Sequence, residues 1–208
     1  MPVIVVANPK GGVGKSTLSS NIAGYFARQG HAVMLGDVDR QQSSRLWLKL
    51  RPDNLPQIQS WDITDDHIAR PPKGTTHIVL DTPAGLHGPG LEAVMKLADK
   101  VVVPLQASVF DIYATQDFLA ELAGRRKGDK AHKTQLAVVG NRIKDHTKAT
   151  EHLKEFLQTL DIPLLGLLRD TQNYAHLAAH GLSLWDVAAT KVEKDLDQWA
   201  PILKWLKD

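Results

Sequence analysis

The stretch that decides the fold is Asn8-Pro9-Lys10-Gly11-Gly12-Val13-Gly14-Lys15-Ser16-Thr17. It follows a short β-branched run, residues 3–7, which is typical of a strand buried on both faces of a parallel sheet. Apolar residues at helical spacing follow over residues 16–29, and Gly30 stands where a helix would end. Strand, glycine-rich loop and helix in this order predict a phosphate-binding loop.

The residue types of this loop suit a triphosphate. Glycines let backbone N–H groups turn inward without Cβ clashes, and the N-terminus of the following helix adds partial positive charge. Lys15 would lie along the β- and γ-phosphates, and the Ser16 hydroxyl would bind Mg²⁺. We therefore expect a nucleoside triphosphate with Mg²⁺, held by Gly11, Gly12, Val13, Gly14, Lys15, Ser16 and Thr17.

Composition sets the outer limits. The chain of 208 residues, 43% hydrophobic and 23% charged, is suited to a single globular domain with a full core. Its formal net charge of +2 permits a weak nucleic-acid surface without requiring one. The absence of cysteine excludes disulfides, thiolate zinc sites and cysteine-held iron–sulfur clusters. With no apolar run long enough to span a bilayer and no visible signal peptide, we expect a cytoplasmic protein.

Carboxylates follow two further predicted strands. Asp37 and Asp39 come after the apolar run 31–36, and Asp81 ends the run 77–80. In an α/β sheet the carboxyl ends of the strands bind ligands, so these side chains would reach the first loop. Asp81 would hold Mg²⁺ in the manner of a Walker B aspartate. Without a ligand, Asp37 and Asp39 would belong to an acidic turn or helix cap, and Asp81 would end its strand in a turn.

The loop departs from the generic pattern, because Pro9 stands in place of the first glycine and Lys10 precedes the glycine pair. The form K-G-G-x-G-K-[ST] resembles the deviant Walker A loop of the ParA/MinD family, P-loop ATPases that position plasmids, chromosomes, division sites and protein cargoes in bacteria. The resemblance extends from residue 3 to about residue 184. It implies ATP as the nucleotide and slow, partner-stimulated hydrolysis. It also implies a catalytic role for Lys10 across the two-fold interface of an ATP-bound homodimer.

The resemblance assigns further residues. The segment from Asp37 resembles the family's D-x-D-P-Q block, with Arg40 in place of proline, so that Asp39 would orient or activate the attacking water and Asp37 would support the metal site. A second block resembles the family's γ-phosphate switch and comprises Asp81, Thr82, Pro83, Ala84 and Gly85. Asn141, followed by Arg142, stands where family members recognise adenine, whose paired acceptor and amino group an amide can match.

The alternation of strand and helix patterns predicts an α/β fold, a P-loop NTPase with a mostly parallel twisted sheet of about seven strands and helices on both faces. We expect one domain over residues 1–208 without an N-terminal helix-turn-helix, and hence no sequence-specific operator binding. Residues 62–76, which lack periodicity, are expected to form a short helix and a loop. Pro201 is expected to kink or split the helix predicted over residues 192–206.

Basic residues offer a possible DNA surface. Arg125, Arg126 and Lys127 begin a cluster that continues to residue 133, which is either a solvated helix end or a phosphate-backbone contact. Arg169 belongs to a C-terminal block resembling the family's, where basic residues serve DNA or partners. His176 and His180 have the spacing of metal ligands on a helix, but no third ligand is evident, so we expect surface or core histidines.

Three functions remain open. The preferred one is a positioning ATPase that binds DNA non-specifically as an ATP dimer, associates with the nucleoid and is reset by a ParB-like stimulating partner. The second is a MinD-like regulator that cycles on membranes through its C-terminal helix. That helix mixes acidic and basic residues, which favours docking on the protein's own core. The third is an ATP-dependent small-molecule ligase.

Overall fold

The computed structural model of the protein describes residues 1–39, 41–61, 63–64, 67–68, 70–128, 134–144, 147–159 and 162–208. They form a seven-stranded sheet in the order β3-β2-β6-β1-β7-β8-β9, in which all neighbouring strands are parallel. Its strands are β1 (Val3–Val6), β2 (Val33–Asp37), β3 (Ile58–Trp61), β6 (His77–Asp81), β7 (Lys100–Gln106), β8 (Gln135–Ile143) and β9 (Leu164–Arg169). The predicted α/β fold class is confirmed.

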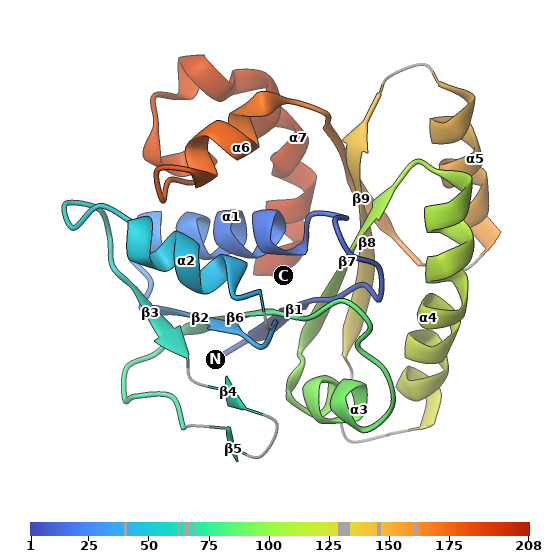
Figure 1. The fold of residues 1–208 in the computed structure, drawn as a ribbon, viewed down its shortest axis with the longest axis horizontal. Coiled ribbons are helices and arrows are strands. Elements are labelled where there is room, and N and C mark those ends of the chain that lie inside the picture. Colours follow the sequence, from blue (N-terminus) through green and yellow to red (C-terminus); the bar gives the residue numbers. More distant parts are fainter. Residues whose placement is uncertain are drawn as a thin grey trace.

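Helices cover both faces of the sheet (Figure 1). One face carries α1 (Lys15–Arg28), α2 (Ser43–Leu50), α6 (Gln172–Ala178) and α7 (Ala189–Lys207), with a 3₁₀ turn, η1 (Leu184–Asp186), between the last two. The other face carries α3 (Gly88–Leu97), α4 (Val109–Gly128) and α5 (Lys148–Thr159). The result is the three-layer arrangement that parallel crossovers impose.

The pleat of β1 divides the core into two. Val3 and Val5 point into the layer beneath α3, α4 and α5, whereas Ile4 and Val6 point toward α1 and α7. All four side chains are buried, because a central parallel strand has no solvated face. This explains why the strands read as continuous apolar runs instead of alternating ones.

Strand register gathers the predicted site at one edge of the sheet. Val6, the last residue of β1, and Asp37, the last of β2, both pair with Asp81 at the end of β6. The phosphate-binding loop leaves β1 at the same edge. Three segments far apart in the sequence therefore meet where the strands end.

Two expectations about local structure were wrong. In place of a short helix, the described parts of residues 62–76 include two short antiparallel strands, β4 (Ile63–Thr64) and β5 (His67–Ile68). Helix α7 continues through Pro201, and its non-helical residue is Val192, with φ −133° and ψ 20°. The residues around Pro201 stay helical because Trp199 and Ile202 are fully buried against the sheet.

The apolar side of α7 docks on the protein's own core, as expected from its mixed charges. Val192, Trp199, Ile202, Leu203 and Leu206 are all buried. In the part of the chain that the structure describes, no helix has the length and apolar character needed to cross a bilayer.

Candidate nucleotide-binding site

The loop between β1 and α1 has the backbone that a phosphate cradle needs. Gly12 and Gly14 adopt φ values of 75° and 97°, a left-handed conformation that other residues rarely take. A Cβ on Gly14 would also lie 2.1 Å from the amide nitrogen of Asn141. The loop opens onto a cavity of about 810 Å³, lined by Gly11, Gly12, Gly14, Lys15, Ser16, Thr17, Val38, Asp39, Gln41, Ser43, Pro83, Ala84 and Arg142.

The two lysines of the loop have different surroundings. Lys15 is buried and its Nζ donates to the carbonyl of Lys10 at 2.9 Å. Burial lowers the pKa of Lys15, against the attraction of the Asp81 and Asp39 carboxylates. Lys10 pairs instead with Asp111, at the start of α4 in the same chain. Thus Lys15 is fixed in the cavity, while Lys10 is held beside it.

Asp81 has the character of a metal ligand. It is 1% exposed, its Oδ2 accepts from Ser44 Oγ at 2.7 Å, and its Oδ1 has no hydrogen-bond partner among the described residues. Burial raises the pKa of Asp81 to about 6, although the Ser16 and Ser44 hydroxyls favour the charged form. A buried, unpartnered carboxylate oxygen close to a hydroxyl fits a hard cation such as Mg²⁺.

Asp37 and Asp39 differ in the number of backbone hydrogen bonds that their carboxylates accept. Both oxygens of Asp37 accept backbone N–H groups, from Asp39 at 3.0 Å and from Arg45 at 2.9 Å. Asp39 accepts from Gln41 N at 3.0 Å and lines the cavity. Asp37 therefore shapes the loop that presents Asp39 to the cavity. Arg40, which stands in place of the family's proline, lies outside the described residues.

The predicted switch segment is tied to β1 and to the phosphate-binding loop. Thr82 Oγ1 donates to the carbonyl of Val6 at 2.9 Å, and Gly85 N donates to the carbonyl of Pro9 at 2.7 Å. Pro83 and Ala84, between these two anchors, line the cavity. A ligand in the cavity would thus touch a short segment held at both ends.

Asn141, the predicted adenine contact, is hydrogen-bonded to the phosphate-binding loop. Asn141 is buried, and its Nδ2 donates to the carbonyl of Val13 at 2.7 Å. Arg142 follows with φ 51° and lines the cavity. The adenine role of Asn141 stays a prediction, while its bond to the loop explains why Gly14 approaches it so closely.

Three contributors to this site were missed from the sequence. Ser44 binds Asp81, Asp111 binds Lys10, and Gln106 Nε2 donates to the carbonyl of Gly12 at 3.0 Å. Gln106 is the last residue of β7, and Asp111 lies in the first turn of α4, which follows it. The carboxyl end of a parallel strand was a signal that could have identified both. Ser44 carried no local signal, because its partner is 37 residues away.

The predicted DNA contacts lie outside the cavity. Arg169 makes a two-pronged bond to Asp195 on α7, with distances of 2.6 and 3.2 Å. Arg125, Arg126 and Lys127 lie near the C-terminal end of the 20-residue helix α4. The other end of this helix carries Asp111, the partner of Lys10. His176 and His180 are exposed, and the described residues contain no cluster of three or more metal-ligating side chains.

Comparison with known proteins identifies the family. A family model described as the CobQ/CobB/MinD/ParA nucleotide binding domain matches residues 4–184. The chain belongs to this family. The match spans the phosphate-binding loop, both aspartate-bearing strands and Asn141, and members of this ParA/MinD family typically hydrolyse ATP.

Individual relatives agree with the family assignment. The chain is 27% identical over 195 residues to maintenance of carboxysome distribution protein A from Halothiobacillus neapolitanus, covering 89% of this chain and 88% of that protein. It is 27% identical over 154 residues to protein ParA of Rhizobium radiobacter, covering 70% and 68%. A putative plasmid partition protein from Borrelia burgdorferi bound to AMPPNP has the same fold, with a TM-score of 0.71, 18% identity and coverage of 98% of both chains.

Proposed function

We propose that this protein is an ATP-driven switch that dimerises on ATP, binds DNA non-specifically and positions a plasmid, chromosome or protein cargo. The observation that carries the proposal is the arrangement of the phosphate-binding loop and Asp39 around one cavity, with Asp37 and the buried Asp81 paired at the same edge of the sheet. The relatives named for carboxysome distribution and plasmid partition support a positioning role.

In the proposed hydrolysis each residue of the site has a separate role. The loop N–H groups and Lys15 would stabilise charge on the β- and γ-phosphates, while Asn141 and Arg142 would contact the base. Asp39, presented to the cavity by the loop that Asp37 supports, would orient a water for in-line attack. Mg²⁺ held by Ser16 and Asp81 would neutralise further phosphate charge when bound.

Dimerisation requires Lys10 to exchange its partner. In this chain Lys10 pairs with Asp111, so reaching a second subunit's nucleotide means leaving that carboxylate. Around Asp111, the side chains of Val109, Phe110 and Tyr113 are 51%, 81% and 68% exposed. An exposed apolar patch beside the nucleotide cavity is suited to an interface between copies. The patch and Lys10 together support a sandwich dimer that forms when ATP is bound.

The two alternatives receive less support. A MinD-like membrane cycle would use the apolar side of the C-terminal helix, and α7 buries that side in the core. A ligase would need a second substrate beside the nucleotide, so turnover that appears only with an organic acid would favour it. DNA binding itself rests on the family relationship, since Arg169 is bonded to Asp195.

The test compares two cavity variants with the parent chain. Asp39→Ala should bind ATP but lose turnover by about a hundredfold, because the attacking water is no longer oriented, and it should remain dimeric by light scattering. Lys10→Ala should remain monomeric with ATP. The dimer should bind DNA of random sequence, whereas anionic liposomes should not retain it. Unchanged turnover in Asp39→Ala would contradict the proposed mechanism.

A further inference from the structure

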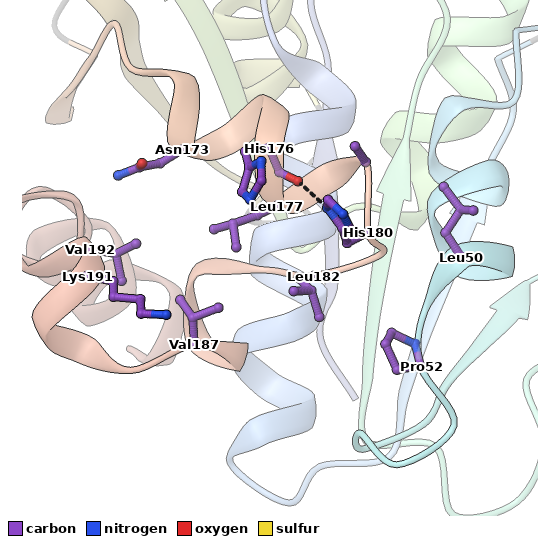
Figure 2. A pocket seen from close by; sticks show the side chains of 11 residues that line it. Leu50, Pro52, Asn173, His176, Leu177, His180, Leu182, Val187, Lys191 and Val192 are labelled. Carbon is purple, nitrogen blue, oxygen red and sulfur yellow. Dashed lines mark hydrogen bonds between the residues drawn. The ribbon is translucent and has the colours of Figure 1, made fainter.

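A second concave site lies at the end of α2 that faces away from the nucleotide cavity. It has a volume of about 690 Å³ and is bounded by Leu50 and Pro52 on one wall and by His176, His180, Leu182 and Lys191 on the other. Figure 2 shows Leu50 and Pro52 facing His180 and Leu182 from opposite sides. We call it the α2–α6 groove. Nothing in the nucleotide chemistry above uses it.

The lining of the α2–α6 groove is apolar with a nitrogen-bearing rim. Its polar side chains are Asn173, His176, His180 and Lys191, and no aspartate or glutamate is among its lining residues. His180 Nδ1 donates to the carbonyl of His176 at 2.9 Å, the bond drawn in Figure 2, so the Nε2 of the neutral ring is a hydrogen-bond acceptor. Lys191 is the charged group among the lining residues, and its ammonium makes this rim complementary to a carboxylate.

The groove extends into an exposed apolar surface along α2. Leu46 and Leu50 are 58% and 45% exposed, although both are large aliphatic side chains. Four residues apart on a helix, they lie on the same face. Apolar surface of this kind beside a pocket is characteristic of a site where a partner docks.

This chemistry favours a peptide over a nucleic acid. The volume lies in the range of sites that take several side chains or a small ligand. Binding of nucleic acid uses clusters of lysine and arginine with stacked aromatic rings. Among the lining residues there is a single lysine, no arginine and no phenylalanine, tyrosine or tryptophan. An amphipathic peptide would bury aliphatic side chains in the groove and place carboxylates on its rim.

Helix α2 connects the groove to the nucleotide cavity. At its start, Ser44 Oγ donates to Asp81 and Arg45 N donates to Asp37. Nearer its end, Trp47 Nε1 donates to the carbonyl of Leu182 at 3.1 Å. A helix of eight residues is about 12 Å long and moves as a rigid body, so a displacement of one end also displaces the other.

The groove end of α2 is held especially firmly. Arg51, the residue after α2, donates to the carbonyl of Gly181 at 3.3 Å and to both oxygens of Asp186. Gly181 has φ 66°, and a Cβ there would lie 2.3 Å from Arg51 N. The two walls of the groove are therefore fixed to each other as well as to the nucleotide site.

We propose that the α2–α6 groove binds an acidic amphipathic segment of a partner protein, and that binding there changes the rate of ATP turnover through α2. The binding half stands on the groove alone. The regulatory half rests on the proposed ATPase function, because it needs the carboxylates at the start of α2 to act in hydrolysis.

Phage carrying random dodecapeptides provide an unbiased probe of the groove. The full chain, without nucleotide, is used to select binders, and selected peptides are synthesised and their affinities measured by fluorescence anisotropy. We expect aliphatic residues with several Asp or Glu. Leu50→Ser and Lys191→Glu should each weaken binding about tenfold or more, because they remove an apolar contact and reverse a rim charge.

The matched control is Lys204→Glu, an equal charge change at another exposed position of α7 that does not line the groove. It should change peptide affinity less than about twofold. The proposal is overturned if no selected peptide depends on Leu50 and Lys191, if the dependent peptides are basic, or if Lys204→Glu weakens binding equally. Loss of binding to a random-sequence DNA duplex in Lys191→Glu, without a groove-dependent peptide, would make the surface a nucleic-acid site instead.

Turnover measured with the selected peptide tests the regulatory half. The peptide should change the ATPase rate of the parent chain severalfold and leave that of Lys191→Glu at its basal value. Peptide binding with an unchanged rate would overturn the coupling but keep the binding site. A chain without any ATP turnover would contradict the proposed function, and the anisotropy result would still decide whether the groove binds peptide.

Discussion

The nucleotide cavity and the α2–α6 groove are neighbours on one helix, yet they are built by different means. The cavity is lined largely by the glycine-rich loop and by residues that follow strand ends, Asp39 among them, and short sequence motifs mark these parts. The groove is formed largely by apolar side chains from two distant parts of the chain, residues 50–52 and residues 173–192, with no motif in either. A polar site needs fixed geometry and therefore a recognisable local sequence, whereas an apolar site needs only complementary shape and burial.

The largest expected effect is a loss of folding stability at the groove end of α2. Arg51→Ala should destabilise the fold by about 3–5 kcal/mol, because Asp186, whose side chain is 0% exposed, would be left as a buried unpaired charge. Urea denaturation measures this loss. The exposed neighbour Lys49→Ala should change stability by less than about 0.5 kcal/mol. Similar losses in both variants would mean that the groove end is not anchored by this pair.

The second prediction concerns Asp81 at the other end of α2 and its dependence on pH. Burial raises its pKa to about 6 in the fold, so the folded chain holds the proton more tightly than the unfolded chain. The resulting stability is complete below about pH 4 and is lost as the pH rises to about 6, an effect of order 3 kcal/mol. Asp81→Asn, which stays neutral, should avoid this loss and become more stable than the parent above pH 6.

Urea midpoints from pH 4 to pH 8, in the presence of a chelator, measure the difference between the Asp81→Asn and parent curves. Added Mg²⁺ serves as the control, since it should stabilise the parent chain above pH 6 and have little effect on Asp81→Asn. Parallel curves for the two chains would contradict the assignment of Asp81 as a buried ligand that is costly to ionise.

The third prediction separates Lys15, which lines the cavity, from Lys10, which lies beside it. Lys15→Ala should weaken ATP binding by about a hundredfold, roughly 2.7 kcal/mol, because Lys15 is a buried cation of the cavity and in the proposed function would face the phosphates. Lys10→Ala should change the affinity of the monomer less than about threefold, because Lys10 is paired with Asp111 in the same chain. Calorimetry at low protein concentration measures both. Equal losses would place Lys10 on its own subunit's nucleotide.

The smallest effect is expected at the groove wall. Leu50→Ser should change the free energy of unfolding by less than about 0.5 kcal/mol and leave ATP affinity unchanged, since its side chain is 45% exposed. Thermal unfolding and calorimetry check the two parts. A loss above about 1 kcal/mol would show that Leu50 supports the fold, and the groove could no longer be treated as a free surface.

The predicted fold was confirmed where the sequence pattern was periodic and strong. The buried strands β1, β2 and β6 correspond to the apolar runs predicted at residues 3–7, 31–36 and 77–80, and the sheet has the predicted number of strands. Residues 62–76 were misread because they have no periodicity, and their short described strands pair only with each other. Pro201 was misread because local propensity was weighed without the burial of Trp199 and Ile202, which keeps the helix intact.

For the site, the sequence by itself predicts which residues would bear the chemistry. Glycine spacing, Lys15 and the strand-end aspartates are local features, because backbone conformation and strand periodicity are encoded over a few residues. The tertiary structure alone decided their partners: Lys10 with Asp111, Ser44 with Asp81, Arg169 with Asp195, and the groove at the end of α2. These contacts join segments 26 to more than 100 residues apart, and only folding brings such segments together.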